Sequence, residues 1–344
     1  MIRHAVSFAA RKRVDIVEEQ VPSPGVGEVL VQTRASLVSP GTEMLVYRGQ
    51  APSEMPVDAK LPAFNGERFT YPIKYGYACV GTVVEAGEAV SDDWHDKTVF
   101  TFHPHETAFL ARPEDLIPLP DDIQEDDALF LPLMETAVNL IQDGAPRLGE
   151  TVAVTGIGVV GLLTTAILAR MPLSGVYALD LYPKRRELAL TLGATAVADP
   201  ADDEAVRALE ARIRSHSPGA DVTFELSGDP AGFNRAISLT ADSGCVVVGS
   251  WYGTKPGAFD LGGRFHRSRL HVLSSQVSSI DPKLQGRWTV QRRQQVAWSM
   301  IREIRPSLQV LSHRLPIKDA ARAYEMMDNS PETTLAIAFD HQVG

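Results

Sequence analysis

A glycine-rich stretch in the middle of the chain constrains the fold more than any other feature of the sequence. It follows an apolar run, residues 151–155, that is typical of a buried strand, and it opens a helix expected from about residue 159. Gly156 permits a tight turn, Gly158 lets the backbone approach a pyrophosphate, and Gly161 lets the helix pack close to the strand. We assign the whole stretch to a dinucleotide site: Gly156, Ile157, Gly158, Val159, Val160 and Gly161.

The next strand predicts which dinucleotide binds. Asp180 ends this strand about 20 residues after Gly161, where a carboxylate accepts hydrogen bonds from the adenosine ribose hydroxyls. Because its charge also repels a 2′-phosphate, we expect NAD(H), with NADP(H) as the less favoured cofactor. Lys184 and Arg185 follow closely, and they either contribute to the cofactor site or form the solvated first turn of a helix.

The pattern of apolar residues divides the chain. From about residue 150, short apolar strands alternate with helices, which is typical of a parallel sheet with helices on both faces. The part before about residue 125 is rich in strands, and within it residues 40–75 predict a long loop that either covers a site or is mobile. Further candidate cofactor contacts stand at the ends of later strands: Ser227, Gly249, Ser250, Ser274, Ser275 and Gln276.

Composition excludes two classes of partner. The formal net charge is −10, whereas phosphate binding needs clustered Lys and Arg in excess, so we expect no nucleic acid. No run of about 18 apolar residues occurs, and the first residues hold no apolar core of signal-peptide length, so we expect a cytoplasmic protein without a membrane partner. Cys79 and Cys245 lie in apolar runs and are expected to be buried, reduced thiols.

The order of these segments resembles the medium-chain dehydrogenase/reductase superfamily over essentially the whole chain. The resemblance is carried by Gly76–Gly87 (GYACVGTVVEAG), by ARPEDLIPLP at 111–120, by LGETV leading into the glycine stretch, and by the tail from Leu315 to Phe339. It implies an α/β fold with a GroES-like β-rich catalytic domain (1–130 and 275–344) and a doubly wound, parallel-sheet Rossmann domain (131–274). It also implies a homodimer joined through an edge strand of the Rossmann sheet near 257–263.

Three shorter segments are similar to one subgroup of that superfamily. They are Ser39–Glu43 (SPGTE), Phe102–His105 (FHPH) and Ser274–Ser278 (SSQVS). The subgroup includes proteins similar to the 2-desacetyl-2-hydroxyethyl bacteriochlorophyllide a dehydrogenase.

The chain departs from the zinc-dependent members of the superfamily at the metal ligands. By the resemblance, Ser39 stands where they have a cysteine, Tyr77 and Ala78 where they have histidine and glutamate, and the third ligand falls near Leu131. Zinc prefers thiolate, imidazole or carboxylate ligands, and two cysteines cannot build a four-cysteine zinc lobe. His103 and His105 lack a third fixed ligand, so we expect no metal site.

Without a metal, a side chain, a water or the cofactor ribose must handle the proton of the reacting oxygen. The resemblance places Ser39, Tyr77 and His103 around the vacated site, and Thr42 near the position of a relay hydroxyl. Glu135 either points into the cleft or caps a helix. Structural roles stay open for each: a turn residue at Ser39, a volume-filling ring at Tyr77 and a loop histidine at His103.

These observations favour a zinc-independent NAD(H)-dependent oxidoreductase that acts on a small alcohol or carbonyl substrate. An enone or quinone-type reductase is the first alternative, because hydride transfer to a β-carbon needs no strong base. A non-catalytic dinucleotide-binding redox sensor is the second. Arginines at 264–269 and 287–293 either clamp the pyrophosphate or an anionic substrate, or form a solvated face.

Overall fold

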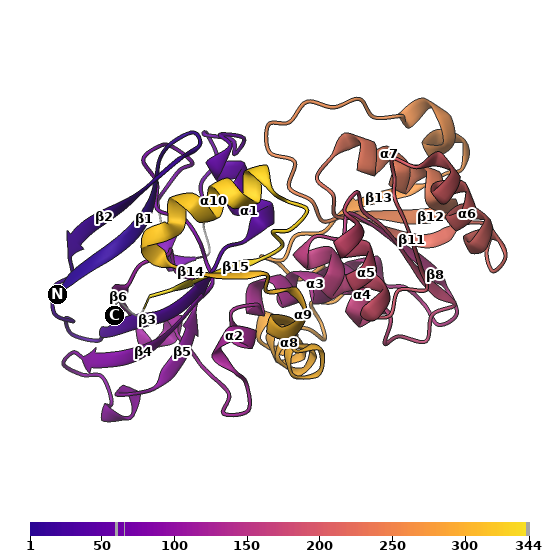
Figure 1. Cartoon of the computed structure of the whole chain (residues 1–344). Helices are drawn as coiled ribbons and strands as arrows, with labels where there is room; N and C mark the ends of the chain where they lie inside the picture. Colours follow the sequence, from indigo (N-terminus) through magenta and orange to yellow (C-terminus); the bar gives the residue numbers. More distant parts are fainter. Residues whose placement is uncertain (59–60, 65, 342–344) are drawn as a thin grey trace. The chain divides into compact units, whose positions relative to one another are not determined.

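Two segments distant in the sequence, Met1–Pro132 and Arg305–Gly344, fold into one unit, and Leu133–Ile304 form a second. The computed structural model describes residues 1–58, 61–64 and 66–341 (Figure 1). Residues 275–304 therefore belong with the second unit, whereas the resemblance assigned them to the β-rich domain. Within the described residues, no helix is both long and apolar enough to cross a membrane.

The second unit is built on a parallel sheet of six strands, ordered β10-β9-β8-β11-β12-β13. Two inner strands of this sheet, β8 and β9, are buried along their whole length, as expected when helices cover both faces of a parallel sheet. The order reverses between β8 and β11, since β9 and β10 lie on one side and β11 to β13 on the other. The six strands are β8 (Thr151–Thr155), β9 (Gly175–Leu179), β10 (Ala196–Ala198), β11 (Ala220–Glu225), β12 (Thr240–Val248) and β13 (His271–Ser274).

Helices connect these strands, and their sequences explain where they begin and what they bury. In α6 the Asp202 side chain accepts hydrogen bonds from two backbone N–H groups of the first turn, and Val206, Leu209 and Ile213 form the buried stripe. The helix after the glycine stretch, α4, is buried almost all round. The helices of this part are α3 (Leu131–Gly144), α4 (Val159–Leu168), α5 (Pro183–Thr191), α6 (Asp203–Arg214), α7 (Pro230–Leu239) and α8 (Val290–Ile304), with a short π-helix, η4 (Leu261–Phe265).

The first unit is β-rich, as the resemblance implies. Its larger sheet has seven strands, β14-β15-β3-β4-β5-β7 with β6 paired to β3, and its two-stranded sheet is the hairpin β1-β2. Its strands are β1 (Ile2–Ala10), β2 (Arg13–Gln20), β3 (Val29–Leu37), β4 (Cys79–Ala86), β5 (Thr98–Thr101), β6 (Ala108–Ala111), β7 (Ile117–Pro118), β14 (His313–Pro316) and β15 (Ile337–Asp340). Its α-helices are α1 (Pro40–Tyr47), α2 (Glu125–Ala128), α9 (Pro306–Val310) and α10 (Ala320–Asn329).

Two expectations about local structure are wrong. Residues 40–75 are not all loop, because α1 begins at Pro40 and buries Met44, Leu45 and Val46. No edge strand forms at 257–263, where η4 begins, and β13 is the outermost strand on that side of the sheet. The Asn234 side chain binds the backbone of this segment, donating to the Ala258 oxygen and accepting from the Asp260 nitrogen, so these groups are not offered to a strand.

Candidate functional site

The glycine stretch adopts a turn that excludes side chains at two of its positions. Gly156 has a φ of +83°, in the left-handed region that favours glycine, and a Cβ there would lie 2.4 Å from the Ser227 nitrogen. A Cβ at Gly161 would lie 2.2 Å from the Gly156 oxygen. Gly156 therefore lets the turn pack against the residues that follow β11, and Gly161 lets the first turn of α4 approach the turn at Gly156.

Gly158 differs from these two glycines because open space surrounds it. A Cβ at Gly158 would meet no atom within 4 Å, and this glycine is the N-cap of α4 without any side-chain cap. The first turn of α4 carries no acidic residue. Backbone N–H groups and the positive end of the helix dipole therefore face an open cradle, which fits a diphosphate. The side chains of Ile157 and Val159 are buried in the core and anchor this turn.

Asp180 lies directly after β9, and its carboxylate is held by the backbone around it. One oxygen, Oδ2, accepts from the Ile157 N–H at 2.9 Å, and Oδ1 accepts from the Tyr182 N–H at 3.0 Å. A carboxylate has about four lone-pair positions, so both oxygens can still accept bonds from a ribose diol. The Arg185 guanidinium stacks on the Tyr182 ring and lies 3.6 Å from Oδ2, whereas Lys184 is exposed on the first turn of α5.

The loops after β11 and β12 are tied to one another at the same edge of the sheet. Ser250 Oγ accepts from the Gly228 N–H at 2.8 Å, and the Gly249 N–H donates to the Glu225 backbone oxygen at 3.1 Å. Ser227 donates through both its N–H and its hydroxyl to Glu225 Oε1. The sequence reasoning missed Glu225, a fully buried carboxylate at the end of β11. Its apolar neighbours in the sequence hide it within a strand pattern.

The segment after β13 contains the remaining cofactor candidates. Ser274 is the last residue of β13, and Ser274 and Gln276 are both exposed. Ser275 is tied down, since its hydroxyl donates to Asp143 Oδ2 at 2.6 Å. Gln276 Oε1 accepts from the Ser278 N–H at 2.6 Å.

Glu135, a candidate catalytic residue, forms a buried ion pair in the second unit. Its Oε1 accepts from Arg293 Nε at 3.2 Å. Burial raises the pKa of Glu135, and the Arg293 charge opposes that rise. The arginines that the sequence suggested as one anion clamp are dispersed: Arg293 is buried, and Arg264 donates to the Thr240 oxygen, at the amino end of β12.

In the first unit, three hydroxyl groups form one cluster at the positions that the resemblance assigns to the vacated metal site. Ser39 Oγ lies 2.5 Å from the Tyr77 hydroxyl, Thr42 Oγ1 lies 2.6 Å from the same hydroxyl, and Thr42 donates to Ser39 at 3.0 Å. Ser39 is the N-cap of α1 and Thr42 follows one turn later, so the helix sets their spacing. Tyr77 reaches them from the stretch before β4.

The hydroxyl cluster, Ser39, Thr42 and Tyr77, consists of three hydroxyl groups, each of which can donate or accept a hydrogen bond. Burial raises the pKa of Tyr77 to about 12, although the hydrogen bonds from Ser39 and Thr42 oppose the rise. The phenol is therefore protonated at neutral pH. Neutral hydroxyls are not the ligands that zinc prefers, and in the described ranges no three His, Cys, Asp or Glu side chains come together as a metal site requires. Leu131 is fully buried and offers no ligand atom.

A buried carboxylate lies directly behind the hydroxyl cluster. Glu43 is fully buried, and its Oε1 accepts from the Ser39 N–H at 2.7 Å. Its Oε2 accepts from the Tyr324 hydroxyl at 2.5 Å and lies 3.0 Å from His105 Nε2. Because Glu43 holds the backbone of Ser39, it orients the first hydroxyl of the cluster. The sequence reasoning weighed Glu43 only as part of SPGTE and His105 only as a weak metal ligand.

His105 extends this contact into a buried chain of polar groups. Its Nδ1 lies 2.7 Å from Ser36 Oγ, which in turn lies 2.8 Å from His341 Nε2. His105 and Ser36 have no exposed surface, and burial lowers the pKa of His341 to about 3. If Glu43 is ionised, one set of tautomers satisfies every bond of this chain: His105 donates from Nε2 and accepts at Nδ1, and His341 donates from Nε2.

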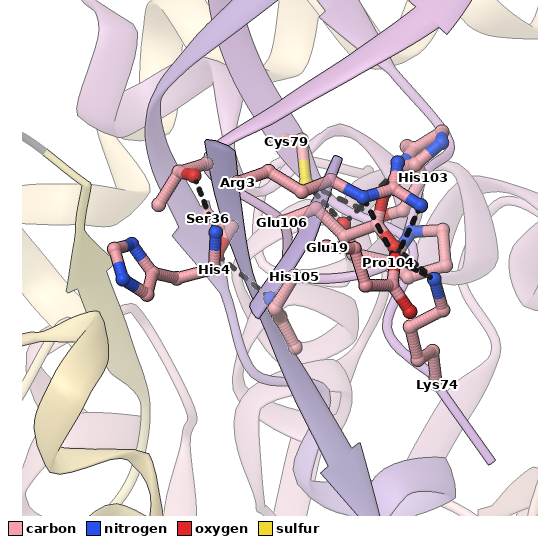
Figure 2. A network of polar contacts seen from close by, with 11 residues as sticks. Arg3, His4, Glu19, Ser36, Lys74, Cys79, His103, Pro104, His105 and Glu106 are labelled. Atoms are coloured by element: carbon pink, nitrogen blue, oxygen red, sulfur yellow. Dashed lines mark hydrogen bonds and ion pairs between the residues drawn. The ribbon is translucent and has the colours of Figure 1, made fainter. Parts of the chain in front are cut away.

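His103 lies beside a charged cluster of Arg3, Lys74 and Glu106, which Figure 2 shows together with His105 and Ser36. The His103 ring stacks on Phe109 at a centroid distance of 3.7 Å, and its Nδ1 lies 3.2 Å from the Pro104 oxygen. Glu106, 3.8 Å from the same Nδ1, is buried and binds both Arg3 and Lys74 at 2.8 Å. Burial lowers the pKa of His103 to about 3, so the ring is neutral at physiological pH. Since a carbonyl accepts from Nδ1, Nε2 carries no proton.

Comparison with known proteins agrees with this architecture. Residues 159–289 match the family described as Zinc-binding dehydrogenase. The (R,R)-butanediol dehydrogenase of Bacillus subtilis (strain 168) is 27% identical over 296 residues, which cover 78% of this chain and 80% of that protein. An alcohol dehydrogenase of E. coli CFT073 solved with NADH has a TM-score of 0.76 at 15% identity, covering 98% of this chain and 99% of the other. A dehydrogenase of Sinorhizobium meliloti 1021 bound to NADP has a TM-score of 0.76 at 20% identity, covering 99% of each chain.

The segment order and the glycine turn agree with these likenesses. These likenesses to zinc-type dehydrogenases support the medium-chain dehydrogenase/reductase superfamily, which the motifs of this chain also resemble.

Proposed function

We propose that this protein is an NAD(H)-dependent oxidoreductase that interconverts an alcohol and a carbonyl compound without a catalytic zinc ion. The observation that carries the proposal is the hydroxyl cluster, in which Ser39 and Thr42 both bind the Tyr77 phenol at 2.5–2.6 Å. Zinc-dependent relatives polarise the substrate oxygen with a metal, so a metal-free member needs a hydrogen-bond donor for that oxygen.

The cluster supplies such a donor. The Tyr77 proton is retained at neutral pH, because burial raises the pKa of this phenol to about 12. Ser39 and Thr42 hold the phenol oxygen in place, and Glu43 fixes Ser39 through the backbone. In the direction of carbonyl reduction the phenol donates its proton to the substrate oxygen, and Ser39 or Thr42 then stabilises the phenolate by donating to it. A proton from solvent then restores the phenol. In the direction of alcohol oxidation the phenol first loses its proton to solvent, and the phenolate then accepts the proton of the alcohol.

The second unit is suited to hold the nicotinamide cofactor, which supplies or accepts the hydride when bound. The cradle at Gly158 is open to a diphosphate, and the Asp180 carboxylate keeps free lone pairs for a ribose diol. We favour NAD(H) because Asp180 repels a 2′-phosphate, although Arg185 lies close enough to weaken that repulsion. We assign no catalytic role to Glu135, whose carboxylate already binds Arg293.

The test is the substitution Tyr77→Phe, which removes only the hydroxyl. We expect kcat to fall by about 10²–10⁴-fold at unchanged NADH affinity, as is typical when a general acid is removed. Tyr47→Phe removes the hydroxyl of another buried tyrosine in the same unit and should leave kcat within about twofold, as expected for a phenol outside the site. Butanediol, named for the Bacillus relative, is a sensible first substrate in a panel of alcohols, aldehydes and enones.

His103→Gln completes the experiment. The neutral His103 ring lacks a proton on Nε2, so we expect this variant to keep near-normal kcat. A large loss in His103→Gln with normal activity in Tyr77→Phe would reverse the assignment. Turnover of enones alone, insensitive to Tyr77→Phe, would favour the enone reductase. NADH binding without turnover of any compound in the panel would favour the redox sensor.

A further inference from the structure

The topology of the parallel sheet assigns the two halves of a dinucleotide to opposite sides of the point where the strand order reverses, between β8 and β11. Asp180 follows β9, so the adenosine half belongs on the β9 side. The other half must then extend over the carboxyl ends of β11, β12 and β13. The segment that follows β13, residues 275–279, which we call the β13 loop, lies at this edge.

A buried arginine holds the β13 loop by its backbone. Arg293, on α8, has 1% of its surface exposed. Its Nη2 donates to the Val277 oxygen at 2.5 Å, and its Nη1 donates to the Ser279 oxygen at 3.2 Å. Two carbonyls of one short loop are thus bound by one planar guanidinium, and this fixes their separation and direction.

The same guanidinium is anchored to helix α3. Its Nε donates to Glu135 Oε1 at 3.2 Å, and Nη1 also donates to Asn139 Oδ1 at 2.7 Å. Asn139 Nδ2 donates to Ser275 Oγ at 3.0 Å and to Asp143 Oδ2 at 2.8 Å. Glu135, Asn139 and Asp143 are spaced four residues apart and therefore share one face of α3. This face of α3 hydrogen-bonds Ser275 directly, and through Arg293 it is connected to the backbone oxygens of Val277 and Ser279.

This arrangement is more specific than packing requires. An apolar side chain could fill the volume of Arg293 without the cost of burying a charge. The Arg293 guanidinium instead binds side chains of α3 and two carbonyls of the loop, and so it keeps the loop in one conformation before a ligand arrives. A loop that is already ordered loses less entropy when the ligand binds. Ser274, the last residue of β13, and Gln276, in the β13 loop, are both exposed to solvent.

We propose that Arg293, held by Glu135 and Asn139, is a positioning residue that shapes the β13 loop to receive the nicotinamide half of the cofactor. This inference rests on the proposed function, in that it requires a nicotinamide dinucleotide to bind. Arg293 acts through the loop backbone and does not contact the reacting atoms itself.

The experiment compares two ligands by titration calorimetry. NADH has both halves of the dinucleotide, whereas ADP-ribose lacks the nicotinamide ring. In Arg293→Lys, which keeps the charge but loses the fork, we expect NADH affinity to fall about tenfold or more while ADP-ribose affinity changes less than about twofold. Arg293→Gln should show the same split. Arg302→Gln, which alters an exposed arginine on the last turn of the same helix, is the matched control and should bind both ligands like the unmutated protein.

The outcomes separate the role of Arg293 from the proposed function. Equal loss of both ligands in Arg293→Lys, or normal affinity for both, overturns the inference, because a general structural role would not separate the two halves. If Arg293→Gln does not fold, circular dichroism reveals it, and Arg293→Lys still supplies the comparison. Failure of the unmutated protein to bind either ligand would instead refute the proposed function, so the two failures are distinguishable.

Discussion

Replacing Asp180 with serine tests how the chain distinguishes NAD(H) from NADP(H). The carboxylate is 7% exposed and accepts N–H bonds from Ile157 and Tyr182, which point it at the ribose position after β9. Serine is shorter and has a single neutral oxygen. It removes the negative charge that repels a 2′-phosphate and the charged acceptor that binds the ribose diol. It also frees Arg185, 3.6 Å from Oδ2, to face a phosphate.

The size of the effect follows from these contacts. A hydrogen bond to a charged group contributes about 1.5–3 kcal/mol, so NADH affinity should fall by about 10–100-fold. Removing one negative charge about 4–6 Å from the 2′-phosphate changes its energy by about 1–4 kcal/mol, so NADPH affinity should rise by about tenfold or more. Two backbone N–H groups lose their acceptor, which should lower stability by about 1–3 kcal/mol per group.

Titration calorimetry of NADH and NADPH with the unmutated protein and with Asp180→Ser measures both changes, and a thermal melt measures the loss of stability. Asp199→Ser is a matched control, because Asp199 follows the neighbouring strand β10 and binds Arg186 at 3.1 Å. It should leave the preference unchanged. Tighter binding of NADPH than of NADH by the unmutated protein, or parallel losses of both cofactors in Asp180→Ser, would refute the reasoning.

Three further predictions follow from the described residues. Because hydroxyls occupy the vacated ligand positions, protein purified without chelator should hold no stoichiometric zinc, and elemental analysis that finds about one zinc per chain would contradict this. We propose that β13, whose outer edge lacks a partner strand among the described residues, joins two copies in a homodimer; light scattering should give twice the chain mass at micromolar concentration, and a monomer would refute it. Burial lowers the pKa of His103 from its ordinary value of 6.5 to about 3 in the folded protein. Between these two pH values the unfolded chain therefore binds a proton that the folded chain does not, and the free energy of unfolding falls as the pH drops below 6.5. His103→Gln should recover about 2 kcal/mol of the stability lost between pH 7 and pH 5, measured by urea unfolding at both pH values, and an unchanged pH dependence would show that the ring is not desolvated.

Much of the cofactor site could be predicted because its constraints are local. The strand β8, the turn at Gly156 and the start of α4 follow one another within a few residues. Gly156 is required by its positive φ and Gly161 by a close neighbour, whereas Gly158 leaves open space at the helix N-terminus. Asp180 is predictable for the same reason, since the next strand of a parallel sheet returns to the same edge. The contact of Ser39 with Tyr77 came from the resemblance rather than from any local pattern.

Tertiary structure alone decided which distant polar groups meet. His105, Ser36 and His341 come from a loop, from β3 and from the end of β15, and no periodicity in the sequence joins them. The same holds for Arg293, which reads as one of several arginines in a polar helix until its contact with Glu135 is seen. The Glu135–Arg293 contact also explains why residues 275–304 belong with the parallel sheet.

Sequence by itself determined the two kinds of sheet, the glycine turn and the place of Asp180 after β9, because apolar periodicity, backbone angles and strand order are properties of neighbouring residues. The structure decided the edge strand, the partners of His103 and His105, and the hydrogen bonds from Arg293 to the β13 loop. A side-chain hydrogen bond forms only within about 3.5 Å, and whether two residues far apart in the chain reach that distance depends on the packing of every element between them.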